Sequence, residues 1–102
     1  MKPGMDIAQA KLTRMLKTNP ITEGMYVRVH GDHLIAGREE PLGPDGEMEA
    51  EDRIRLTRLT TTRYGLSVKR HTGRWERTPF SGSMEELLEV VWGLMQHLVA
   101  PY

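Results

Sequence analysis

The chain of 102 residues contains no cysteine and one phenylalanine, and its 14 acidic residues balance 14 lysines and arginines, so it carries no net charge. The absence of cysteine excludes disulfides, thiolate metal ligands and cysteine nucleophiles. No segment reaches the roughly 20 apolar residues that span a bilayer, so we expect no membrane partner. The opening "MKPGMDIAQAKL" lacks the apolar run of a secretory signal, which predicts a cytoplasmic protein.

The motifs of several enzyme classes are also missing. The chain has no Gly-x-x-x-x-Gly-Lys, no Gly-x-Gly-x-x-Gly, no Gly-x-Ser-x-Gly and no His-Glu-x-x-His. The acidic stretch "DGEMEAED" does not match a calcium loop, because Gly46 directly follows Asp45 and does not occupy the sixth position. We therefore predict a non-enzymatic protein without a cofactor.

The residues that are present are typical of a globular domain, with 38% hydrophobic and 27% charged residues. A chain of this length fits one domain. We predict a single α+β domain over residues 1–102. Its parts are an N-terminal helix segment (1–20), an antiparallel β-meander of about five strands (24–80) and a C-terminal amphipathic helix (83–99) packed on one sheet face.

The N-terminal helix is predicted over about residues 6–18. Asp6 followed by Gln9 is typical of a capping box, and the helix should stop before Asn19-Pro20. Ala8, Leu12 and other apolar residues recur at helical spacing and form a thin apolar face.

Two histidines flank a predicted hairpin turn in "VHGDHL". Alternating residues in "MYVRV" and "HLIAG" predict two strands joined by Gly31-Asp32, with Val29 opposite Leu34 and His30 opposite His33. His30, Asp32 and His33 are weak candidates for metal ligands, but a zinc site needs three or four ligands. We predict a turn and no metal, with acid-sensitive repulsion between the two imidazoles.

Residues 39–52 are rich in Gly, Pro and acids, and they predict an exposed acidic loop that could fold over neighbouring basic strands. Three further strands follow in "RIRLTRLTTTRYGLSVKRHTGRWERTPF". A β-bulge near Thr57–Arg58 would place Leu59 on the apolar face with Ile54 and Leu56.

The C-terminal helix has the clearest signals, with Ser83 and Glu86 in capping-box spacing. Val90, Trp92 and Val99 fall partly outside its main apolar stripe. Either neighbouring loops or a second subunit must cover them. The second possibility predicts a homodimer with these three residues at the interface.

A basic block gives the strongest functional signal. Seven arginines and one lysine lie between Arg53 and Arg77, opposed by Glu76 alone. Such a sheet surface could neutralise phosphates and stack bases. We predict that it engages nucleic acid or another anionic partner, such as an acidic protein, through phosphate or carboxylate contacts. The predicted contact residues are Arg53, Arg55, Lys69, Arg70 and Arg74, with Tyr64 or Trp75 as stacking residues. Two alternatives stay open: a merely solvated sheet face, and a homodimeric protein-interaction module.

Overall fold

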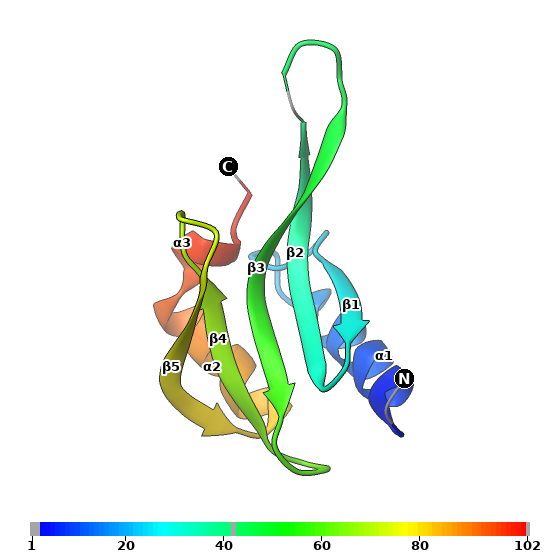
Figure 1. The fold of residues 1–102 in the computed structure, drawn as a ribbon, viewed down its shortest axis with the longest axis vertical. Helices are drawn as coiled ribbons and strands as arrows, with labels where there is room; N and C mark the ends of the chain where they lie inside the picture. The colour runs from blue at the N-terminus through cyan, green and yellow to red at the C-terminus, as the bar shows by residue number, and fades with distance from the viewer. Residues whose placement is uncertain (1–2, 42, 102) are drawn as a thin grey trace.

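A computed structural model describes residues 3–41 and 43–101 and shows the predicted α+β fold (Figure 1). The elements are α1 (Met5–Leu16), β1 (Tyr26–His30), β2 (His33–Pro41), β3 (Met48–Arg58), β4 (Tyr64–Lys69), β5 (Trp75–Gly82), α2 (Met84–Leu94) and α3 (Gln96–Val99). The strands form one antiparallel sheet in the order β1-β2-β3-β4-β5. The predicted five-stranded meander is confirmed.

The helices pack on one face of this sheet. α1 contacts β1 and β2, α2 contacts β4 and β5, and α3 contacts β3. Apolar side chains of both layers form the core, and they include Leu12, Leu16, Leu34, Ile54, Leu56, Leu66, Leu87, Leu88 and Val91. The opposite side of the sheet carries no helix (Figure 1). We call it the open face.

The β1–β2 hairpin has the predicted register. Val29 pairs with Leu34, and His30 pairs with His33 across the Gly31-Asp32 turn. Gly31 has φ +60°, a left-handed conformation that glycine adopts without strain. The alternation of apolar and polar residues on either side of the turn is therefore enough to predict the register of this hairpin.

The start of α1 differs from the prediction. Gly4, with φ +80°, precedes the helix and makes no side-chain cap, while Asp6 lies inside the first turn. The Gln9 amide does not complete a capping box, because it donates to the Val27 carbonyl at 2.8 Å. The Gln9 side chain, which the local sequence pattern assigned to the helix cap, is thus engaged in a tertiary contact with β1.

The acidic segment 39–52 is mostly strand and not the predicted loop. β2 continues to Pro41 and β3 begins at Met48, and the two pair as a ribbon, for example Glu39 with Ala50. Figure 1 shows this ribbon projecting beyond the rest of the sheet. We call residues 39–51 the acidic arm. It extends away from the other strands and does not cover them.

The predicted bulge near Thr57–Arg58 is wrong. The β2–β3 register shifts between Ala36 and Gly37, so that Arg53 is an extra residue between Asp52 and Ile54. Leu59 follows the end of β3 and is 59% exposed, so it does not join the apolar face.

The C-terminal helix begins as predicted and ends early. The Ser83 and Glu86 capping box is present, but α2 ends at Leu94 and Met95 separates it from the short α3. Arg38 and Arg53, which lie on the sheet, donate hydrogen bonds to the carbonyl oxygens of Leu98, Val99 and Ala100. These contacts hold the last helical turn against the sheet.

Candidate anion-binding face

Strand register brings a row of side chains together across the open face. Arg28 pairs with Ile35, Ile35 with Arg55, Arg55 with Ser67, and Ser67 with Arg77. Because side chains alternate between the two faces of a sheet, these five share a side, opposite the side that Leu34, Leu56 and Leu66 bury against the helices. The row therefore holds three arginines from three different strands.

Arg55 and Arg77 border a shared cleft of about 320 Å³ on this face. Its other lining residues are His33, Thr57, Leu59, Gly65, Ser67, Thr78, Pro79, Phe80 and Ser81. None of the lining residues is acidic, and neither arginine forms an ion pair within residues 3–41 and 43–101. The cleft thus has a mixed polar and apolar lining and two arginines without an ion pair among the described residues.

The Arg55 guanidinium shows the electrostatic cost of this arrangement. Burial, and then the nearby charge of Arg77, hold the pKa of Arg55 below its usual value. Its buried Nε has no hydrogen-bond partner among the residues that the structure describes. An anion in the cleft would supply both a partner and an opposite charge.

Trp75 lies beside this cleft and packs against two cations. The Arg55 guanidinium carbon is 4.8 Å from the centroid of the Trp75 ring, and the Lys69 Nζ is 5.6 Å from it. Cations at such distances are attracted by the electron-rich ring face. Trp75 therefore positions Arg55 and Lys69, and it remains partly exposed.

An internal acid neutralises the neighbouring part of the open face. Asp52 accepts from the Tyr26 hydroxyl at 2.5 Å and from Arg28 Nη2 at 2.6 Å, and Lys69 Nζ lies 3.8 Å away. Burial raises the pKa of Asp52, but these hydrogen bonds and charges outweigh it and leave the pKa below its usual value. Burial and the Asp52 carboxylate raise the pKa of Tyr26.

The β4–β5 turn places two more cations at the end of the same strands. Arg70 and Arg74 are exposed, and their backbones are joined by a hydrogen bond of 2.9 Å from Arg70 N to Arg74 O. The Arg70 guanidinium pairs with Glu76. Both side chains sit at one end of the sheet, where an extended ligand crossing the cleft could reach them.

Two of the predicted contact residues do not lie on the open face. Tyr64 is 5% exposed and belongs to the core, so a base cannot stack on its ring. Arg53 is also 5% exposed, and it donates to the carbonyls of Leu98 and Ala100 and pairs with Glu40 and Glu51. Tyr64 and Arg53 are therefore not part of the candidate anion-binding face.

Of the three predicted interface residues, Val99 is covered by the chain itself, and Val90 and Trp92 are partly buried. Val99 is fully buried, and the Trp92 indole donates to the Thr22 hydroxyl at 3.1 Å. Val90 packs partly buried against the core. Val90 and Trp92 stay partly exposed near the exposed Leu94, and the homodimer remains a prediction.

Among the described residues, His30, Asp32 and His33 do not form a cluster that could hold a metal ion. Across the described residues no group of three or more His, Cys, Asp or Glu side chains is placed to hold a metal. The His30 and His33 rings are stacked with centroids 6.5 Å apart, and His33 Nδ1 lies 2.8 Å from Thr57 Oγ1. Burial, Arg55 and His30 lower the pKa of His33.

The sequence placed Arg77 in the basic block without singling it out, and it gave no sign that His33 lines the same cleft. Arg55 and Arg77 are 22 positions apart, and only the β3–β4–β5 register makes them neighbours. Alternation was a signal for Arg55, which lies between the buried Ile54 and Leu56, but not for Arg77, which lies between the exposed Glu76 and Thr78 of the same cleft.

The fold and the site together define a small α+β sheet protein with helices on one face and an open, arginine-bearing face on the other. In three comparisons with known proteins, no family model, curated protein or solved structure matches this chain. Within the described residues, no helix is long and apolar enough to cross a membrane.

Proposed function

We propose that this protein is a non-enzymatic binding module that holds single-stranded nucleic acid by its phosphates on the open face. The observation that carries the proposal is the cleft in which Arg55 and Arg77 face each other without an acid. Two like charges brought together in a half-buried site destabilise each other. A phosphate removes that repulsion and accepts bidentate hydrogen bonds from guanidinium groups.

The surrounding cations extend the site along the sheet. Lys69 and Arg55 are held against the Trp75 ring, and Arg70 and Arg74 lie at the adjoining turn. Several phosphate contacts at separate positions suit an extended polyanion better than a single small anion. In this proposal Trp75 positions the cations, and its exposed part offers the stacking contact that Tyr64 cannot make.

Salt-dependent binding of a fluorescent oligothymidylate tests the proposal by anisotropy. The double variant Arg55→Gln/Arg77→Gln should bind at least tenfold more weakly at low salt. The slope of log K against log salt should fall by about 1.4, because each phosphate contact to a single strand contributes about 0.7. Arg14→Gln/Lys17→Gln is the matched control, because it removes two exposed charges from α1 and its C-terminal end, on the helix side.

Two results would contradict the proposal. One is equal loss of affinity in the control, which would show that only net charge matters. The other is binding of polyglutamate as tight as that of the oligonucleotide, which would assign the face to an acidic protein. The proposal also keeps the cytoplasmic location expected from the sequence.

A further inference from the structure

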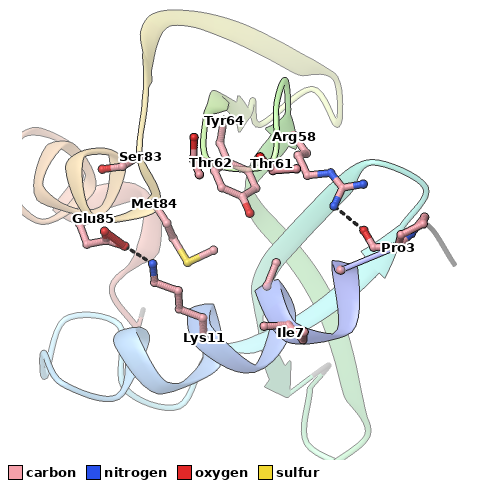
Figure 2. Close-up of a pocket in the computed structure, with 12 residues that line it drawn as sticks. Pro3, Ile7, Lys11, Arg58, Thr61, Thr62, Tyr64, Ser83, Met84 and Glu85 are labelled. Atoms are coloured by element: carbon pink, nitrogen blue, oxygen red, sulfur yellow. Dashed lines mark hydrogen bonds and ion pairs between the residues drawn. The ribbon is translucent and has the colours of Figure 1, made fainter.

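A second cavity lies on the helix side of the sheet, away from the open face. It has a volume of about 580 Å³ and lies between α1, the start of α2 and the β3–β4 turn (Figure 2). Small-molecule sites in proteins are usually about 300–1,000 Å³. The cavity is therefore large enough for a ligand of several carbon atoms.

Apolar side chains form much of its lining. Ala8 and Met84 are buried at the cavity wall, whereas Ile7 is 72% exposed and has the most exposed large apolar side chain among the described residues. Figure 2 shows Met84 pointing from α2 toward α1, where Ile7 lies, and both residues line the cavity. An apolar ligand would cover surface that is otherwise left to water.

Tyr64 brings a polar group to this space. The residue is 5% exposed, and Figure 2 shows its hydroxyl pointing from the sheet toward α1, into the cavity. The hydroxyl makes no hydrogen bond with any residue of the described chain. The hydroxyl is therefore free to donate to an acceptor group of a ligand in the cavity.

Charged residues stand at the two ends of the cavity. Lys11 Nζ and Glu85 Oε1 form an ion pair of 2.5 Å that joins α1 to α2. At the other end, Arg58 Nη1 donates to the Pro3 carbonyl at 2.6 Å, and no acid within the described residues pairs with its guanidinium. Figure 2 shows Arg58 and Tyr64 at the same side of the cavity.

We propose that this cavity binds a small amphipathic carboxylic acid. Its hydrocarbon part packs on Ile7 and Met84, and its carboxylate accepts from the Tyr64 hydroxyl and from Arg58. The free guanidinium hydrogens and the hydroxyl both donate, so the pair selects an anionic or carbonyl head over a donor head. This site is independent of nucleic-acid binding on the open face.

Octanoate is the probe, with 1-octanol as its uncharged control, in titrations followed by amide chemical shifts. Octanoate should bind saturably and shift amides of residues 4–11, 58–64 and 83–85, and 1-octanol should bind at least tenfold more weakly. Arg58→Gln and Tyr64→Phe should each weaken octanoate binding by about tenfold, the loss expected for one hydrogen bond to a charged group. Arg63→Gln is the matched control, because Arg63 is exposed on the same turn and does not line the cavity.

A second readout keeps the test valid if a variant folds poorly. Tyr64→Phe removes an unpartnered hydroxyl, so its urea midpoint should equal or exceed that of the parent protein. A marked drop would show that the hydroxyl already has an internal partner and would overturn the proposal. Absence of saturable shifts, equal binding of 1-octanol, or shifts confined to the Arg55 and Arg77 cleft would overturn it as well.

Discussion

Arg38 and Arg53 are buried, and their guanidinium groups bind carbonyl oxygens at the C-terminal end of the chain. Arg38 donates to Val99, Glu23 and Ile21 at 2.6 to 3.0 Å, and Arg53 donates to Leu98 and Ala100. The bonds to Leu98, Val99 and Ala100 satisfy carbonyls that the last helical turn leaves without partners. Arg55 is two positions after Arg53 and instead faces the open side, beside Trp75. The same residue type is therefore structural at one position and available to a ligand at the other.

Gly37 is a position where one added methyl group should destabilise the fold. A Cβ there would lie 2.2 Å from the Glu51 carbonyl oxygen and 2.5 Å from the Tyr26 hydroxyl oxygen. The sheet backbone cannot move away cheaply, so Gly37→Ala should lower the free energy of unfolding by about 2 kcal/mol or more. Urea denaturation measures this change.

Gly93→Ala is the matched control for that substitution. Nothing lies within 4 Å of a Cβ at Gly93, which is in α2. Alanine should therefore stabilise the protein by about 0.5–1 kcal/mol through its better helix propensity. Equal effects of the two substitutions would contradict the close packing at the bulge.

Asp52 should make stability depend on pH in the acid range. Its pKa is lowered in the folded state, because the bonds from Arg28 and Tyr26 outweigh the effect of burial. A carboxylate with a lowered folded-state pKa stabilises the fold above its unfolded pKa, near 3.9, and loses that contribution as the pH falls through the folded value. The stability difference between the parent and Asp52→Asn should therefore be largest at neutral pH and shrink below about pH 4. A difference that is constant with pH would show that the Asp52 network is not formed.

At the scale of elements, the acidic arm is a two-stranded ribbon with no further strand paired to either edge. β1 pairs with β2 only as far as Gly37, and β4 pairs with β3 only from Ile54 onward. Isolated two-stranded ribbons are marginally stable, so the arm should open without global unfolding.

Amide hydrogen exchange measures that local opening. Amides of Glu39, Glu40 and residues 48–51 should exchange on the order of 100-fold faster than those of residues 34–36 and 54–56, which corresponds to an opening free energy lower by about 3 kcal/mol. Matching protection in the two regions would contradict the description of the arm as an independent ribbon.

The elements differ in how far their sequences reveal them. The His30–His33 hairpin and the Ser83 cap depend on adjacent residues, and both were predictable. The acidic arm was not, because both of its faces are solvated and its acids hide the alternation that a half-buried strand shows. The contacts that hold the C-terminal end of the chain come from Arg38 and Arg53, which are distant in sequence.

The candidate site follows the same division. Residues of the basic block were visible as a charge pattern, but their separation into buried and open positions was not. The register shift next to Gly37 inserts Arg53 as an extra residue, and the alternation of β3 changes there. The predicted bulge near Thr57–Arg58 lies after both residues. It therefore could not show that Arg53 is buried while Arg55 lies on the open face.

Over the whole molecule, several acids pair with arginines or lysines, but the cleft of Arg55 and Arg77 lies apart from the acidic arm. The acids of residues 39–51 lie on the arm that projects beyond the sheet, whereas Arg55 and Arg77 share a cleft without acids on the open face (Figure 1). A net charge of zero therefore hides a local positive field. This separation reconciles a neutral composition with the proposed binding of a polyanion.

The two tryptophans give the most direct test, since they lie on opposite sides of the sheet. Trp75 packs against Arg55 and Lys69 on the open face, and Trp92 donates to Thr22 on the helix side. The measurement is a titration with oligothymidylate, followed by the two indole N–H resonances. We predict a saturable shift of the Trp75 resonance and little change for Trp92. A shift of Trp92 alone, or no shift of either at saturation, would contradict binding on the open face.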